Sequence, residues 1–180
     1  MNTPSPLSRL HDLLRALGYE SHWLPREPES PCERVLIRLS AADSESPQLL
    51  QLFFMEDLLE QPDGPSMLSF TVSWESLTLA QLSPARQLEA LRLLTLCNKL
   101  LPLGALGVEH QSENLYFSYS LLAEDQNRNA ALISEIIDML GFYLPQIQAL
   151  FVQLLSGNRP LKLILEKSGL MAHFRKSSGP

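Results

Sequence analysis

The spacing of apolar residues changes several times along the chain, and each change predicts a helix or a strand. The first pattern is helical, because Leu7, Leu10 and Leu14 recur every three or four residues. We expect a helix over residues 6–17, and Ser5 stands where a helix cap is favoured. One face of this helix is apolar, so it needs a partner surface in the fold.

Segments with strand character follow the first helix. A short strand is expected within residues 19–25, and residues 33–40 alternate between apolar and polar side chains, as a half-buried strand does. Residues 48–57 are more uniformly apolar and aromatic, which favours a central strand, with a short helix as the alternative. Strict alternation returns in residues 67–74, where one face carries Leu68, Phe70, Val72 and Trp74.

The spacing then becomes helical again. Ser83 and Pro84 suit the start of a helix, and Pro102 ends the pattern. This helix is expected to pack on the sheet through a wide apolar face, formed by Leu88, Leu91, Leu93, Leu94, Cys97, Leu100 and Leu101.

Two strands and a long helix complete the pattern. The strand pair is expected within residues 105–122, with its turn at residues 110–114. The helix is expected from residue 127 or 129 to residue 155, kinked but continuous, because the apolar register is the same on both sides of Pro145. Residues 161–174 are expected to form a short helix or a docking segment.

This order of elements predicts an α+β fold, in which helices pack on an antiparallel sheet in the order α-β-β-β-β-α-β-β-α. A chain of 180 residues with 45% hydrophobic content suits a single domain, which we assign to residues 1–158. Residues 159–180 are a basic C-terminal extension that we expect to be partly disordered. Five basic residues and one acidic residue give this extension a charge of +4, and since the whole chain carries -6, the body carries -10.

The charge and the apolar runs exclude several classes of protein. A net charge of -6 argues against nucleic-acid binding, which depends on basic side chains that displace phosphate counterions. The best candidate for a membrane span, residues 93–108, is interrupted by Asn98 and Lys99. The N-terminal residues lack the basic and apolar regions of a signal peptide. We therefore expect a cytoplasmic protein of bacterial type without an integral membrane segment.

The residues that usually perform chemistry do not form a motif in this sequence. The histidines are isolated and lack metal-ligand spacing, and the two cysteines are not in a CxxC motif. Cys97 falls on an apolar helical face and is expected to be a buried thiol, whereas Cys32 lies in a proline-rich loop and is expected to be more exposed. We expect no catalytic residue, no metal ligand and no cofactor. The alternative is an enzyme whose site combines Cys32 or His110 with acidic loop residues.

Glycines after the second long helix resemble a phosphate-binding loop only superficially. A phosphate loop leads from a strand into a helix, whereas Gly104 and Gly107 follow a helix and precede strands. Their position indicates a tight helix-to-strand turn.

The apolar strands suggest a surface for a protein partner. Residues 48–57 and 67–74 offer more apolar surface than one layer of helices covers, which suits binding of a peptide or subunit through pockets or through addition of an edge strand. We expect Trp74 and Phe54 to be the most exposed of these residues. The predicted partner-binding set is Phe53, Phe54, Phe70 and Trp74.

The centre of the sequence resembles a known family. The segment 96–122 carries the matching residues Asn98, Leu100, Leu101, Pro102, Gly104, Gly107, Tyr116, Phe117 and Tyr119. On these residues the chain resembles the YbjN family and, more remotely, the type III secretion chaperone-like (Tir chaperone-like) fold. By element order the resemblance covers about residues 6–155, and the extension 159–180 does not align with it.

The resemblance implies a small, acidic α+β domain that forms a homodimer. Secretion chaperones of this shape hold an extended segment of a client protein, whereas YbjN-like proteins are described as regulators, and no catalytic residue comes with either. We therefore expect a non-enzymatic protein-binding module that holds a client or partner protein on an apolar surface. The alternative is a regulatory or structural subunit of a bacterial complex, docked through its basic extension.

Overall fold

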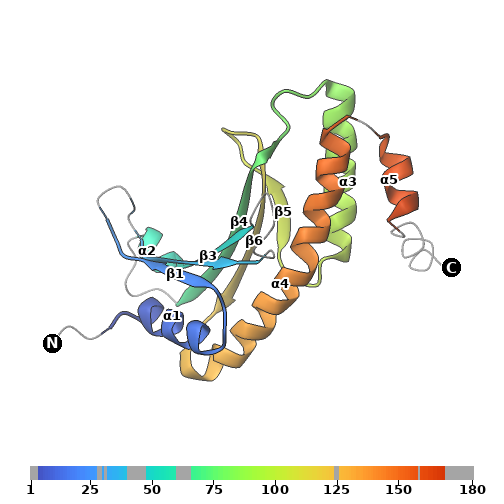
Figure 1. Ribbon diagram of the computed structural model, residues 1–180. Coiled ribbons are helices and arrows are strands. Elements are labelled where there is room, and N and C mark those ends of the chain that lie inside the picture. Colours follow the sequence, from blue (N-terminus) through green and yellow to red (C-terminus); the bar gives the residue numbers. More distant parts are fainter. Residues whose placement is uncertain are drawn as a thin grey trace.

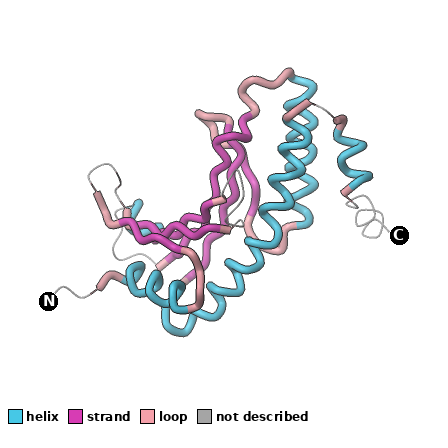
Figure 2. The backbone as a smooth tube through the Cα atoms, in the orientation of Figure 1, coloured by secondary structure: helices cyan, strands magenta, loops and turns pink. Residues whose placement is uncertain are grey.

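The fold is seen in a computed structural model, which describes residues 4–27, 30, 32–39, 48–59, 66–123, 126–157 and 159–168. The predicted α+β class is confirmed: the described residues form an antiparallel sheet packed by helices (Figure 1). The sheet is strongly curved, and α1, α3 and α4 lie on one side of it (Figure 2).

The sheet has six strands in the order β1-β2-β3-β4-β6-β5, and every neighbouring pair is antiparallel. This order makes β3 an interior strand, as its apolar sequence predicted, and makes β1 and β5 the two edges. The strands are β1 Ser21–Leu24, β2 Arg34–Arg38, β3 Leu49–Phe54, β4 Met67–Thr78, β5 Ala105–Val108 and β6 Asn114–Leu122.

Five helices accompany the sheet in the described part of the chain. They are α1 Pro6–Ala16, α2 Met55–Leu59, α3 Pro84–Leu100, α4 Gln126–Leu155 and α5 Leu161–Lys167. The predicted element order is confirmed, with α2 and α5 in addition. Since α2 directly follows β3, the strand and the short helix that were alternatives for residues 48–57 occur one after the other.

The core lies between the helices and the inward-facing side of the sheet. Alternate residues of β4 and β6 point into it, and Phe70 and Phe117 are fully buried there. Complete burial of such a side chain stabilises the fold by about 1.5–3 kcal/mol. The period-two pattern of the sequence therefore identifies which face of these strands carries the core.

The long helix α4 continues across Pro145, as predicted. Its inward residues are fully or nearly fully buried, namely Ile133, Ile136, Ile137, Leu140, Leu144, Ile147, Phe151 and Leu154. Polar contacts also hold the helix in place: the Tyr19 hydroxyl donates to an Asp138 carboxylate oxygen at 2.6 Å, and Gln48 Nε2 donates to the Leu144 carbonyl at 3.3 Å.

Helix α3 buries a narrower face than the sequence suggested. Ala90, Leu93 and Cys97 are buried against the core, whereas Leu88 and Leu91 are 51% and 45% exposed. The prediction that Leu88 and Leu91 belong to the packed face was wrong. Residue 88 is on the side of the helix opposite to Ala90, Leu93 and Cys97, so packing of that trio leaves it outside.

The segment 130–155 of α4 is, by length and composition, apolar enough to cross a membrane. The best candidate predicted from the sequence was a different segment, residues 93–108. A core helix of a soluble protein passes the same test, and the inward side of α4 is packed against the rest of the fold.

The first part of the C-terminal extension belongs to the folded body. Leu161, Ile164 and Leu165 of α5 are buried and join the hydrophobic core. The short helix expected within residues 161–174 is present as α5, and residues 175–180, for which disorder was predicted, lie outside the described residues.

Candidate partner-binding surface

The four residues predicted to bind a partner do not form one surface. Phe54, Phe70 and Trp74 are buried on the side of the sheet that the helices cover, and Phe53 is half-buried on the opposite side. The expected exposure of Trp74 and Phe54 was wrong. Successive residues of a strand point to opposite faces, and this alternation puts both side chains in the core.

The side of the sheet that carries Phe53 mixes hydroxyl-bearing and apolar side chains, and Leu49, Tyr116 and Leu122 are exposed there. Ser69 is the neighbour of Phe53 on β4, and its hydroxyl is 2.9 Å from that of Ser120 on β6. Thr71 and Ser118 form the next cross-strand pair on this side. Ser69 and Thr71 of β4 lie between Phe53 on β3 and the exposed apolar residues of β6, so the apolar groups are dispersed and this face alone does not define a binding patch.

At the β5 edge of the sheet, a side chain of α3 occupies the outward backbone groups of one residue, Leu106. Asn98 Oδ1 accepts a hydrogen bond from the backbone N–H of Leu106 at 2.7 Å, and Asn98 Nδ2 donates to the Leu106 carbonyl at 3.1 Å. The side-chain amide therefore satisfies both backbone groups that a further strand would use at this position. The sequence singled out Asn98 through the family resemblance only, without this role.

Replacing Asn98 with alanine is expected to lower the free energy of unfolding by about 1–3 kcal/mol, because two hydrogen bonds to a partly buried backbone are lost. Leu106 then presents an unpaired N–H and carbonyl, and we also expect association that depends on protein concentration. Urea denaturation and light scattering measure these two effects.

Thr95 of the same helix provides the control. Its hydroxyl donates only to the Leu91 carbonyl of its own helix, so Thr95→Ala is expected to change the unfolding free energy by less than about 0.5 kcal/mol. Equal stability of the Asn98→Ala and Thr95→Ala proteins would show that the hydrogen bonds of Asn98 to Leu106 do not stabilise the fold.

The β1 edge has free backbone groups, and so has the β5 edge at Val108, which alternates with the hydrogen-bonded Glu109. The Arg38 N–H of β2 donates to the Glu20 carbonyl, so Glu20 faces β2. Along an antiparallel strand, residues that face the neighbouring strand alternate with residues that face away from it. Trp23 is three residues after Glu20, and it therefore directs its N–H and carbonyl away from β2. Ser21 is directed the same way, and its carbonyl accepts a hydrogen bond from His11 Nε2 at 3.3 Å. No described residue provides a hydrogen bond to the outward backbone groups of Trp23.

A groove follows this free edge. It has a volume of about 670 Å³ and lies between α1 and β1, where its lining includes His11, Arg15, Tyr19 and Trp23. Trp23 is 36% exposed, and its side chain is on the helix side of the sheet, as is that of its partner Val35. No pattern in the sequence predicted this groove, because it depends on how α1 packs beside the edge strand.

The groups considered for catalysis are not brought together. His110 is exposed in the turn between β5 and β6, and no hydrogen bond or ion pair connects it to Cys32 in the described part of the chain. Cys32 is the more exposed of the two cysteines, as predicted, but it is buried too, and burial raises the pKa of its thiol. Cys97 is buried as predicted, and burial raises its pKa to about 12, which makes its thiol unreactive.

Comparisons of this chain with protein-family models, with curated proteins and with solved structures find no match. The resemblance to the YbjN family and to secretion chaperones therefore stays a prediction from the residues. The geometry of the two sheet edges is the basis for a functional proposal.

Proposed function

We propose that this protein is a non-enzymatic protein-binding module that holds an extended segment of a client protein as an additional strand on β1. The observation that carries the proposal is the free outward backbone of Trp23 beside a groove between α1 and β1. The N–H and carbonyl of Trp23 have no partner among the described residues, whereas at the β5 edge Asn98 occupies the outward groups of Leu106.

Both kinds of interaction that strand addition needs are supported at β1. The outward N–H and carbonyl of Trp23 offer a client backbone two hydrogen bonds, each worth about 0.5–1.5 kcal/mol. The exposed indole of Trp23 offers apolar surface to one side chain of the added strand, and the groove beside it accommodates more of the segment. Backbone hydrogen bonds supply affinity in this mode of recognition, and side-chain pockets supply specificity.

A module of this kind suits a chaperone that keeps a client segment soluble or competent for export. The acidic body, with its net charge of -10, disfavours association with nucleic acid and so fits a protein client. We further propose, from the resemblance to secretion chaperones, that the protein is a cytoplasmic homodimer. Sedimentation analysis of the purified chain tests the dimer separately from client binding.

The test of strand addition is co-purification from an extract of the protein's own cells, with clients identified by mass spectrometry. Trp23→Pro removes the outward N–H without removing a hydrogen bond to β2, since proline is tolerated where the N–H of an edge strand faces solvent. We expect this variant to recover at least about ten-fold less client, which corresponds to the loss of one hydrogen bond and the indole contact.

Two further variants separate the edge from other surfaces. Trp23→Ala keeps the N–H and loses the indole, so it is expected to recover an intermediate amount of client. Phe53→Ser changes the opposite side of the sheet and is expected to recover as much client as the natural chain. Full recovery by Trp23→Pro, with a normal circular dichroism spectrum, would refute binding at the β1 edge.

A further inference from the structure

A second groove lies on the other side of the molecule, between the C-terminal end of α3 and the middle of α4. It has a volume of about 470 Å³, and apolar side chains dominate its lining, among them Leu100 of α3, Leu101 directly after it, and Ile147 and Leu150 of α4. Ser168, the residue that follows α5, stands at its margin. Nothing in the proposed client binding at β1 uses this groove.

Phe142 is a large aromatic residue of this groove that is exposed to solvent. Its side chain is 64% exposed, the largest value among the large apolar residues of the described chain, although the ring lines the groove. The Phe142 ring packs edge-to-face against the neighbouring Tyr143 ring, and the two ring centroids are 5.1 Å apart. Removing such an exposed ring from water is favourable, so another apolar segment is expected to pack against Phe142.

The chain itself supplies a segment that fits. Residues 169–174 have the sequence GLMAHF, and they continue directly from Ser168 at the margin of the groove. Leucine, methionine and phenylalanine side chains suit an irregular apolar groove, methionine because it is flexible. Six residues reach about 20 Å when extended, and a tether this short gives an effective concentration on the order of millimolar.

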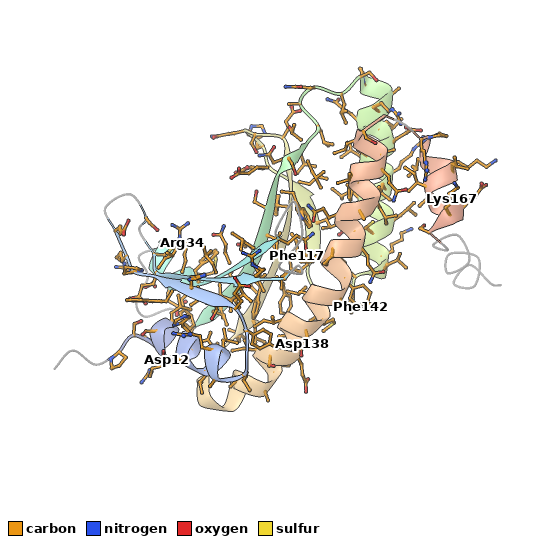
Figure 3. The ribbon with its side chains drawn as sticks, viewed as in Figure 1. Asp12, Arg34, Phe117, Asp138, Phe142 and Lys167 are labelled. Carbon is orange, nitrogen blue, oxygen red and sulfur yellow. The ribbon has the colours of Figure 1, made fainter. Side chains whose placement is uncertain are left out.

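The charges beyond the groove favour the same occupant. Arg175 and Lys176 follow the apolar residues of the segment. Glu135 and Asp138 precede Phe142 by seven and four residues on α4, so the three side chains lie along one side of the helix, and all three are exposed. Figure 3 shows Phe142 between Lys167 near the end of α5 and Asp138. A segment that runs from Ser168 past Phe142 therefore brings its basic residues towards acidic ones.

We propose that residues 169–174 fold back into the groove between α3 and α4 and cover Phe142, with Arg175 and Lys176 directed towards Glu135 and Asp138. The groove is then an internal docking site for the C-terminal segment. A second copy of the chain is the competing occupant, because the same apolar groove is available to a neighbouring molecule.

Photo-cross-linking of the full chain distinguishes the two occupants. Phe174 is replaced by p-benzoylphenylalanine, and protein labelled with ¹⁵N is mixed with unlabelled protein before irradiation. We expect cross-links from position 174 to residues of α3 and α4 at the groove, with both peptides carrying the same isotope. Cross-linked pairs of mixed isotope would assign the groove to a second copy and overturn the proposal, as would cross-links to other surfaces alone.

A matched pair of variants on α4 tests the role of Phe142. Phe142→Ser removes an exposed ring at the groove and is expected to reduce the cross-link yield about ten-fold. Val152→Ser changes another exposed apolar residue of the same helix, 47% exposed and away from the groove lining, and is expected to leave the yield unchanged. Equal yields from the two variants would also overturn the proposal. Neither result depends on client binding at β1.

Discussion

Replacing Gly104 with alanine is expected to lower the free energy of unfolding by about 3 kcal/mol or more. Gly104 has a φ of +70°, a conformation that costs a residue with a side chain roughly 1–2 kcal/mol. An added Cβ would also lie 2.6 Å from two ring atoms of Phe117 and 2.6 Å from the Ser118 carbonyl oxygen. Phe117 is fully buried and the oxygen belongs to the backbone of β6, so neither can yield without disturbing the core. Urea denaturation of the two proteins measures the loss.

Gly107 is the matched control in the same turn-and-strand segment. A Cβ there would also meet a ring, that of Tyr116 at 2.5–2.7 Å, but this ring is 38% exposed and can rotate into solvent. The φ of Gly107 is not positive, so alanine adopts it without strain. Gly107→Ala is therefore expected to cost less than about 1 kcal/mol. Similar losses for Gly104→Ala and Gly107→Ala would contradict the distinction between a buried and a movable neighbour.

The two glycines illustrate how far the sequence predicts this fold. Gly104 lies in the predicted turn between α3 and β5, because local sequence order determines that much, whereas Gly107, predicted for the same turn, lies inside β5. The different tolerance of the two positions depends on Phe117 and Tyr116, which approach from β6. Such contacts between separate segments are not visible in local spacing.

Periodic elements were predicted well for the same reason. The alternation in β4 and β6 and the helical spacing in α4 are properties of short windows, and each window contains its own signal. Helix α3 was predicted in position but not in packing, since Leu88 and Leu91 have helical spacing like the buried Leu93 and yet remain exposed. The width of the buried face of α3 depends on the elements that pack against it, and these lie outside the short stretch of sequence that shows the helical spacing.

The candidate surface was the least predictable part. Trp74 and Phe54 were predicted to be exposed because they are large and apolar, but core residues have the same properties. The features that now carry the proposal are the outward backbone groups of Trp23 and the groove beside them. The direction of these groups follows from hydrogen-bond register and the groove from the packing of α1 beside β1, and both depend on contacts between separate segments.

Raising the pH from 9 towards 12 is expected to destabilise the protein partly through Cys97. Burial raises the pKa of this thiol from an ordinary value of 9.0 to about 12, because the thiolate is poorly solvated in the core. Below pH 9 the thiol is protonated in both the folded and the unfolded chain, so its ionisation does not lower the free energy of unfolding there. Between pH 9 and 12 only the unfolded chain releases the proton, so stability falls by roughly 1.4 kcal/mol per pH unit and by about 4 kcal/mol in total.

Substitution isolates this contribution from other alkaline titrations, including that of Tyr19, whose pKa is raised by burial and by its hydrogen bond to Asp138. Cys97→Ala is expected to be less stable at pH 8, because sulfur packing is lost, and to lose stability less steeply above pH 9. Cys32→Ala is the control, since Arg34 and Arg26 partly offset the effect of burial on the pKa of Cys32 and its own contribution is smaller. Urea denaturation under reducing conditions at pH 8, 9, 10 and 11 gives the slopes. A slope for Cys97→Ala equal to that of the natural chain would mean that the folded protein accommodates the thiolate, contrary to the buried environment described for α3.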